Sequence, residues 1–145
     1  IAEIIAINGY EEHIANSTMR EINSAWHTIM DDEKKHYGMF LTLLRRYDPK
    51  QARAYQEHIN AAQDTRSSMQ TYVPNYEKQL ILANLRQDIK GELEASILYE
   101  DLAEQVQQRD VKETLLSVSA EEKGHVEHLT RLLLKYDADP YDGLK

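Results

Sequence analysis

The chain has 145 residues, of which 41% are hydrophobic and 29% charged, and its net charge at pH 7 is −8. It has no cysteine, which excludes disulfides, thiolate metal sites, cysteine-ligated iron–sulfur clusters and a cysteine nucleophile. The acidic balance argues against a nucleic-acid partner, and no apolar run is long enough for a membrane span. Because no signal-peptide pattern is present either, we expect a cytoplasmic protein with no membrane partner.

Apolar residues recur at helical spacing through most of the chain, and glycine and proline are scarce, which predicts helices rather than strands. A first helix is expected from Ile1 to about Ala15. Thr18, followed three residues later by Glu21, resembles a capping box that starts a second helix. That helix should end just before Pro49, because proline pushes the preceding residue away from helical geometry.

Pro49 itself suits the first turn of a further helix over about 50–67, which a loop from Ser67 to Asn75 follows. A long helix is then expected over roughly 76–106. Asp110 with Glu113 is a second helix-start signal and opens the last helix.

These elements predict one all-α domain, residues 1–145, built as a four-helix bundle of two helical hairpins. The hairpins are residues 1–48 and 76–137, and a long crossover connection, 49–75, contains the extra helix. A connection of this length can cross the full height of a bundle.

The two hairpins repeat one another at an offset of 89 residues. Of the 46 aligned pairs from Glu3 to Asp48, 12 are identical, whereas unrelated segments would match at about 3. The copies agree on carboxylates and imidazoles, which are the ligand types of a dinuclear metal site in a helical bundle. The aligned positions are Glu3, Glu33 and His36 in the first copy and Glu92, Glu122 and His125 in the second.

The spacing allows these six side chains to meet. Each glutamate lies 15 residues from the middle of its own turn, so antiparallel partners hold all four at one level. Each histidine follows a glutamate by three residues and shares its helical face. Four buried carboxylates would repel, and two divalent cations would neutralise them. Such Glu-x-x-His pairs also arise by chance on exposed helices, but the shared register favours a metal site.

The motifs Glu92-x-x-Ala95-x-x-x-Tyr99-Glu100 and Glu121-Glu122-Lys123-Gly124-His125 resemble those of the ferritin-like superfamily, in particular its rubrerythrin-type and bacterioferritin-like diiron domains. The first hairpin repeats the pattern more loosely. The resemblance implies that Glu33 and Glu122 bridge two metals, that Glu3 and Glu92 are terminal ligands, and that His36 and His125 each bind one ion. The chain is also similar to encapsulin-associated ferritins, which build the site between chains.

By this resemblance we expect a protein with two iron ions, although manganese is compatible with the ligands and zinc could substitute. The implied function is a ferroxidase that oxidises Fe(II) with dioxygen or peroxide in iron handling or oxidative-stress defence. Glu33 and Glu122 would be its catalytic residues, and a homo-oligomer, a dimer or larger, is expected. Ala95 stands where rubrerythrins carry an additional glutamate, which weakens a peroxidase interpretation.

Two alternatives stay open: a manganese- or iron-dependent enzyme that decomposes peroxide, and a metal-stabilised bundle without catalysis. Among the other residues, Tyr10 and Tyr99 either hydrogen-bond a ligand carboxylate or are ordinary core tyrosines. His13 has no repeat partner and is expected to be solvated.

Overall fold

The computed structural model of the chain describes residues 1–61 and 73–138. All regular structure within these residues is helical: α1 (Ala2–Ala15), α2 (Arg20–Tyr47), α3 (Pro49–Ala61), α4 (Lys78–Gln105) and α5 (Arg109–Tyr136). The predicted all-α, ferritin-like bundle is therefore confirmed. Among the described helices, none has the length and apolar character needed to span a membrane.

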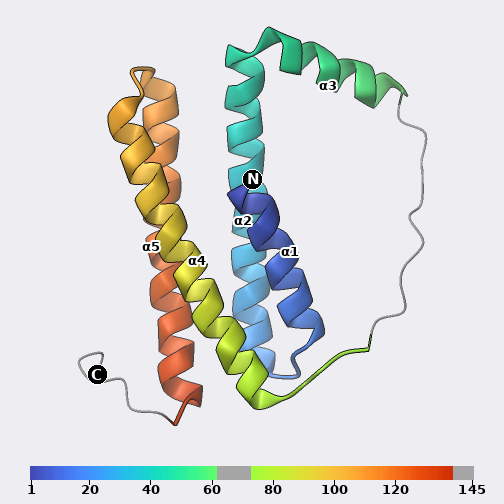
Figure 1. Cartoon of the computed structure of the whole chain (residues 1–145), viewed down its shortest axis with the longest axis vertical. Coiled ribbons are helices and arrows are strands. Elements are labelled where there is room, and N and C mark those ends of the chain that lie inside the picture. Colours follow the sequence, from blue (N-terminus) through green and yellow to red (C-terminus); the bar gives the residue numbers. More distant parts are fainter. Residues whose placement is uncertain (62–72, 139–145) are drawn as a thin grey trace.

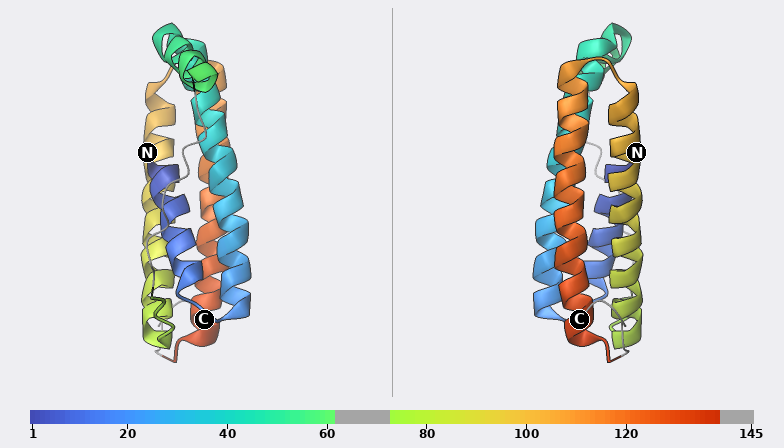
Figure 2. Two further views of the ribbon diagram at one scale, coloured as in Figure 1. Left: turned by 90° about the vertical axis from the view of Figure 1, so that its right-hand side faces the viewer. Right: turned by 90° about the vertical axis from the view of Figure 1, so that its left-hand side faces the viewer.

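Helices α1 and α2 form one antiparallel hairpin and α4 and α5 form the other, with α3 leading away from the end of α2 (Figure 1). The two hairpins lie side by side along a common long axis (Figure 2). Helix α2 ends at the top of the molecule and α4 begins at the bottom, so these two helix ends lie at opposite ends of the bundle (Figure 1). The division into two hairpins and a crossover, as domain boundaries, stays a prediction.

Helix α1 has 14 residues and α2 has 28, so α1 covers only the lower half of the bundle and starts at mid-height (Figure 1). Its first turn carries Glu3. Glu3, the first predicted ligand, therefore lies at mid-height of the bundle, and α1 does not extend above this level.

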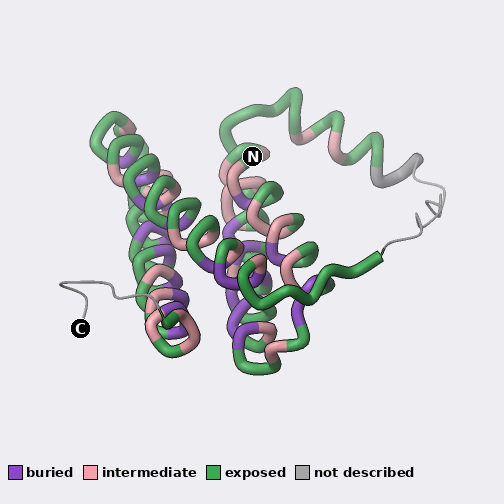
Figure 3. The backbone as a smooth tube through the Cα atoms, turned by 60° about the horizontal axis from the view of Figure 1, so that its bottom comes forward, coloured by how far each residue is buried: buried purple, intermediate pink, exposed green. Residues whose placement is uncertain are grey.

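Buried residues lie along the inner faces of the helices (Figure 3), and the apolar ones among them form two clusters. The larger one lies around Trp26 and Leu129 in the lower half, and the smaller one around Tyr99 and Val118 in the upper half. Between them along every long helix lies a layer of buried carboxylates and histidines. The apolar clusters hold this polar layer at a fixed height.

The predicted cap of α2 is wrong. Its N-cap is Met19, with no side-chain cap hydrogen bond, and Thr18 is exposed. The Ser17 hydroxyl instead accepts the N–H of Met19 itself, at 3.1 Å, which stabilises the turn before the helix without capping the helix. A polar residue one position earlier therefore closes this turn.

The predicted start of α5 is also shifted. Its N-cap is Gln108, and Asp110 lies in the first turn, where its Oδ1 accepts the N–H of Val111 at 2.9 Å. The Asp110 carboxylate is held by Arg46 and by the Tyr47 hydroxyl, 2.7 Å away, at the end of α2. Asp110 thus stabilises the first turn of α5 and contacts the other hairpin at the same time.

The predicted start of α3 at Pro49 is confirmed, with Asp48 Oδ1 accepting N–H groups of Lys50 at 3.0 Å and Gln51 at 3.1 Å. The helix expected over 50–67 is described as far as Ala61. Its remainder and most of the loop predicted before Asn75 lie outside the described residues.

Candidate dinuclear metal centre

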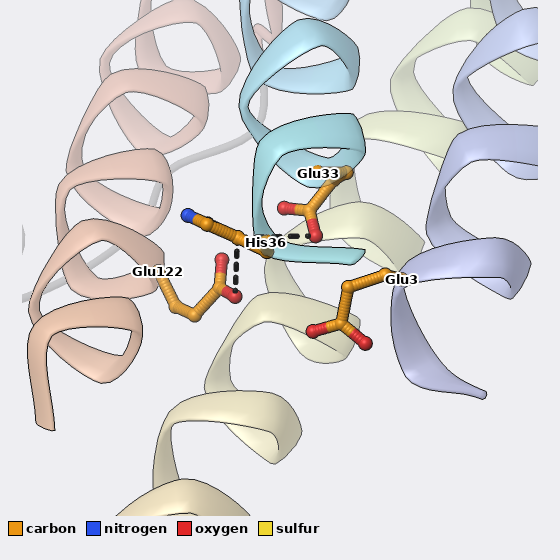
Figure 4. A group of neighbouring side chains, drawn as sticks. All are labelled: Glu3, Glu33, His36 and Glu122. Atoms are coloured by element: carbon orange, nitrogen blue, oxygen red, sulfur yellow. Dashed lines mark ion pairs between the residues drawn. The ribbon is translucent and has the colours of Figure 1, made fainter. Parts of the chain in front are cut away.

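The structure brings all six candidate ligands into one buried layer. Helices α1 and α4 each supply a glutamate, and α2 and α5 each supply a glutamate and a histidine. None is more than 7% exposed: Glu3, Glu33, His36, Glu92, Glu122 and His125. Figure 4 shows four of these side chains pointing toward one another from three helices.

Their donor atoms form two overlapping groups, and within each group one atom per residue lies within 4.8 Å of the others. The first group is Glu3, Glu33, His36 and Glu122, and the second is Glu33, Glu92, Glu122 and His125. Only Glu33 and Glu122 belong to both. This is the arrangement that two adjacent cations with two shared carboxylates require.

Both imidazoles present the same nitrogen to the shared carboxylates. His36 Nδ1 lies 3.5 Å from Glu33 Oε2 and 3.3 Å from Glu122 Oε1. His125 Nδ1 lies 3.4 Å from Glu33 Oε1 and 3.1 Å from Glu122 Oε2. The two rings are stacked with centroids 6.1 Å apart. Each ring can therefore offer Nδ1 to one cation.

The opposite nitrogen of each ring faces a carboxylate of the other hairpin. His36 Nε2 lies 3.1 Å from Glu121 Oε2, and His125 Nε2 lies 3.4 Å from Asp32 Oδ2. Asp32 and Glu121 are equivalent in the repeat, each directly before a shared glutamate. A proton held on Nε2 by such a carboxylate leaves the lone pair on Nδ1. Sequence reasoning missed this pair, although its repeated position was a usable signal.

The tyrosine hydroxyls also act across the hairpins. Tyr10 donates to Glu92 Oε1 and Tyr99 donates to Glu3 Oε1, and both tyrosines are buried. Of the two roles considered for them, the structure shows the contact with a candidate ligand. Burial and the neighbouring carboxylates raise the pKa of both hydroxyls, so they stay protonated donors.

Protons balance the charge of the layer where no cation is bound. Burial by itself lowers the pKa of both histidines, but hydrogen bonds with Glu122 and Glu33 outweigh it. The pKa of His36 rises to about 10 and that of His125 to about 12. Burial raises the pKa of Glu92, whereas for Glu122 the hydrogen bonds with both histidines overcome burial and lower the pKa.

Two buried atoms of the layer, Glu33 Oε1 and His36 Nδ1, make no hydrogen bond of good geometry, although His125 Nδ1 lies 3.4 Å from the first and Glu122 Oε1 lies 3.3 Å from the second. An unsatisfied buried polar atom costs about 1–3 kcal/mol and calls for an explanation. A cation next to both atoms supplies one. Two divalent cations would also neutralise the four carboxylates, and oxygen with imidazole suits iron or manganese and, less selectively, zinc. The residues present therefore fit a pair of such cations.

One histidine differs from expectation. His13 is not solvated but partly buried, with Nδ1 3.0 Å from Asp88 Oδ2. The same Asp88 oxygen accepts a 2.8 Å hydrogen bond from Trp26 Nε1. A fully buried indole needs a partner for its N–H group, and Asp88 of the other hairpin provides it. No repeat relates these residues, so only the packing of the hairpins reveals them.

The comparisons with known proteins agree with this architecture. The Rubrerythrin family model matches residues 83–142. Over 70 residues the chain is 39% identical to a ferritin-like–encapsulin shell fusion protein of Pyrococcus furiosus, a match that covers 48% of this chain and 20% of that protein. No solved structure matches the chain significantly. The described helices form a ferritin-like bundle, and the second hairpin is similar to the rubrerythrin family.

Proposed function

We propose that this protein binds two Fe(II) ions in the buried layer and acts as a ferroxidase, with dioxygen or hydrogen peroxide as the oxidant. The observation that carries the proposal is the pair of donor groups that share Glu33 and Glu122. Glu3 and His36 would hold one ion, Glu92 and His125 the other, and the shared glutamates would lie between them.

The proposed reaction moves two electrons. Each Fe(II) gives up one electron and becomes Fe(III). Dioxygen takes both electrons and two protons and leaves as hydrogen peroxide; peroxide takes two electrons and two protons and leaves as two water molecules. The protons come from solvent.

In this proposal the chain's own residues position the ions and manage charge. Tyr10 and Tyr99 fix one oxygen of each terminal carboxylate, so that the other can face the ion. Asp32 and Glu121 keep Nδ1 of each imidazole free to bind. Binding two Fe(II) ions would displace the two protons that the histidines otherwise hold, so four positive charges enter the layer while two leave it.

The rubrerythrin match favours an oxidoreductase, and the named relative joins a ferritin-like part to an encapsulin shell. We therefore also propose that this chain works in a homo-oligomer, a dimer or larger, in the cytoplasm. Unlike a site shared between subunits, the candidate ligands all come from one chain. Oligomerisation is thus not needed to complete the donor set.

The test is to load the protein anaerobically with Fe(II), admit air, and follow the near-ultraviolet absorbance of ferric iron. The wild type should oxidise iron faster than buffer does, and Glu33→Ala combined with His36→Ala should not. Glu127→Ala with His128→Ala is the matched control, because it removes the same residue types from the exposed face of α5.

Two other outcomes would replace the proposal. Tight binding of iron without faster oxidation would favour a metal-stabilised bundle without catalysis. Rapid oxygen evolution from peroxide by the manganese-loaded protein would favour a peroxide-decomposing enzyme.

A further inference from the structure

A cavity of about 400 Å³ lies between α1 and α4 and is partly open to the surface. Four of the candidate ligands form its inner end: Glu3, Glu33, Glu92 and Glu122. One of these four is Glu33, whose Oε1 makes no hydrogen bond of good geometry. The cavity therefore leads from the surface to the centre of the carboxylate layer.

The cavity exists because the facing surfaces of the two helices carry small residues. Ala6 and Gly9 of α1 lie opposite Gly91 and Ala95 of α4. A Cβ atom added at Gly9 or Gly91 would meet no neighbouring atom within 4 Å. Glycine inside a helix is unfavourable by about 1 kcal/mol relative to alanine, so these glycines weaken their helices and leave space open.

The lining indicates which molecules can pass. Its walls are apolar, with Ile5 and Leu98 near the mouth, and its other charged side chains include the carboxylates of Asp88 and Glu94. Among the described residues that line it there is no lysine or arginine. Apolar walls disfavour any ion that must lose its water, and the carboxylates repel anions further. An uncharged molecule meets neither obstacle.

We propose that the α1–α4 cavity is the route by which a small uncharged oxidant, dioxygen or hydrogen peroxide, reaches the metal centre. The identity of the oxidant rests on the proposed function; the passage of uncharged molecules does not. The opposite side of the carboxylate layer is not apolar, because there Nε2 of each histidine faces a carboxylate, that of Glu121 or Asp32.

The variants Gly9→Leu and Gly91→Leu, made separately, narrow the cavity from opposite walls. Leucine is a better helix former than glycine, and the space at both positions is open, so both variants should fold. Gly38→Leu is the matched control: Gly38 is also helical with open space around it, but it does not line the cavity.

The first measurement uses the metal-free protein. Trp26 is the single tryptophan and is fully buried behind Asp88 and His13, both of which line the cavity. Quenching of its fluorescence by acrylamide, an uncharged probe, should fall several-fold in both cavity variants and stay unchanged in Gly38→Leu. Unchanged quenching in both cavity variants would overturn the proposed route, whatever the protein does with iron.

The second measurement uses the iron-loaded protein. Both cavity variants should bind as much Fe(II) anaerobically as the wild type but oxidise it several-fold more slowly, at every oxidant concentration below saturation. Wild-type oxidation rates in both variants would refute the oxidant route. A wild type that does not oxidise iron would instead refute the proposed function, and the quenching result would still decide whether the cavity admits uncharged molecules.

Discussion

Replacing Tyr10 by phenylalanine should weaken metal binding without disturbing the fold. The substitution removes only the hydroxyl that donates to Glu92 Oε1 and keeps the ring, which is 2% exposed and part of the larger core cluster. Glu92 would then lose one of its partners and keep His125, whose Nδ1 lies 3.2 Å from Oε2. Its carboxylate would rotate more freely, and part of its preorganisation for a cation would be lost.

Two independent scales give the size of the effect. Hydrogen bonds to charged groups contribute about 1.5–3 kcal/mol. Removing an outer partner of a metal ligand typically lowers metal affinity about 10–100-fold, which corresponds to about 1.4–2.7 kcal/mol. Because the two ranges agree, we expect a 10–100-fold loss of affinity at one of the two cation positions.

Anaerobic titration with Co(II), followed by its visible absorbance, measures this loss directly. Tyr136→Phe is the control, because Tyr136 also donates to a glutamate, Glu21, at 2.5 Å, but on the surface. Surface changes of this kind usually matter by less than about 0.5 kcal/mol. Affinity equal to wild type in Tyr10→Phe, or an equal loss in Tyr136→Phe, would refute the reasoning.

Three further predictions concern charge and packing. Metal affinity should rise with pH and binding should release protons, because His36 and His125 hold protons at neutral pH in the metal-free state; calorimetry in buffers of different ionisation enthalpy would show no proton release if this is wrong. The stability of the metal-free protein should change in the opposite direction. The raised pKa of His36 stabilises the folded state fully at pH values below the unfolded-state pKa of 6.5, and this contribution disappears as the pH rises through about 10. Urea unfolding that shows increasing stability over this pH range would contradict the prediction. Leu129→Ala should cost about 2–5 kcal/mol because Leu129 is fully buried, whereas Leu116→Ala, at a residue that is 44% exposed, should cost much less; equal losses in chemical unfolding would argue against the described core.

The helices and the register of the candidate ligands could be predicted because both depend on periodicity along one chain segment. Apolar spacing predicts the helices, although in α1 and α4 some of these residues are exposed, such as Ile5 at 67% and Ile97 at 59%. The spacing of Glu33 and His36 places them on one face together. The 89-residue repeat then relates them to Glu122 and His125. No knowledge of how the hairpins pack is needed for these inferences.

Contacts between the hairpins could not be predicted in the same way. The partner of Tyr10 proved to be Glu92, and the partner of His13 proved to be Asp88. Each contact depends on how one hairpin is rotated against the other, which no local pattern records. Asp110 shows the same effect, because its contact with the end of α2 cannot be inferred from its place at the start of its own helix.

The central claim is that one chain holds two cations between two shared carboxylates, and counting bound ions tests it most directly. Anaerobic titration of the wild type with Fe(II) should saturate near two ions per chain, and Glu33→Ala with His36→Ala should abolish this uptake. Saturation at one ion or none in a correctly folded wild type, or undiminished uptake by the double variant, would contradict the account.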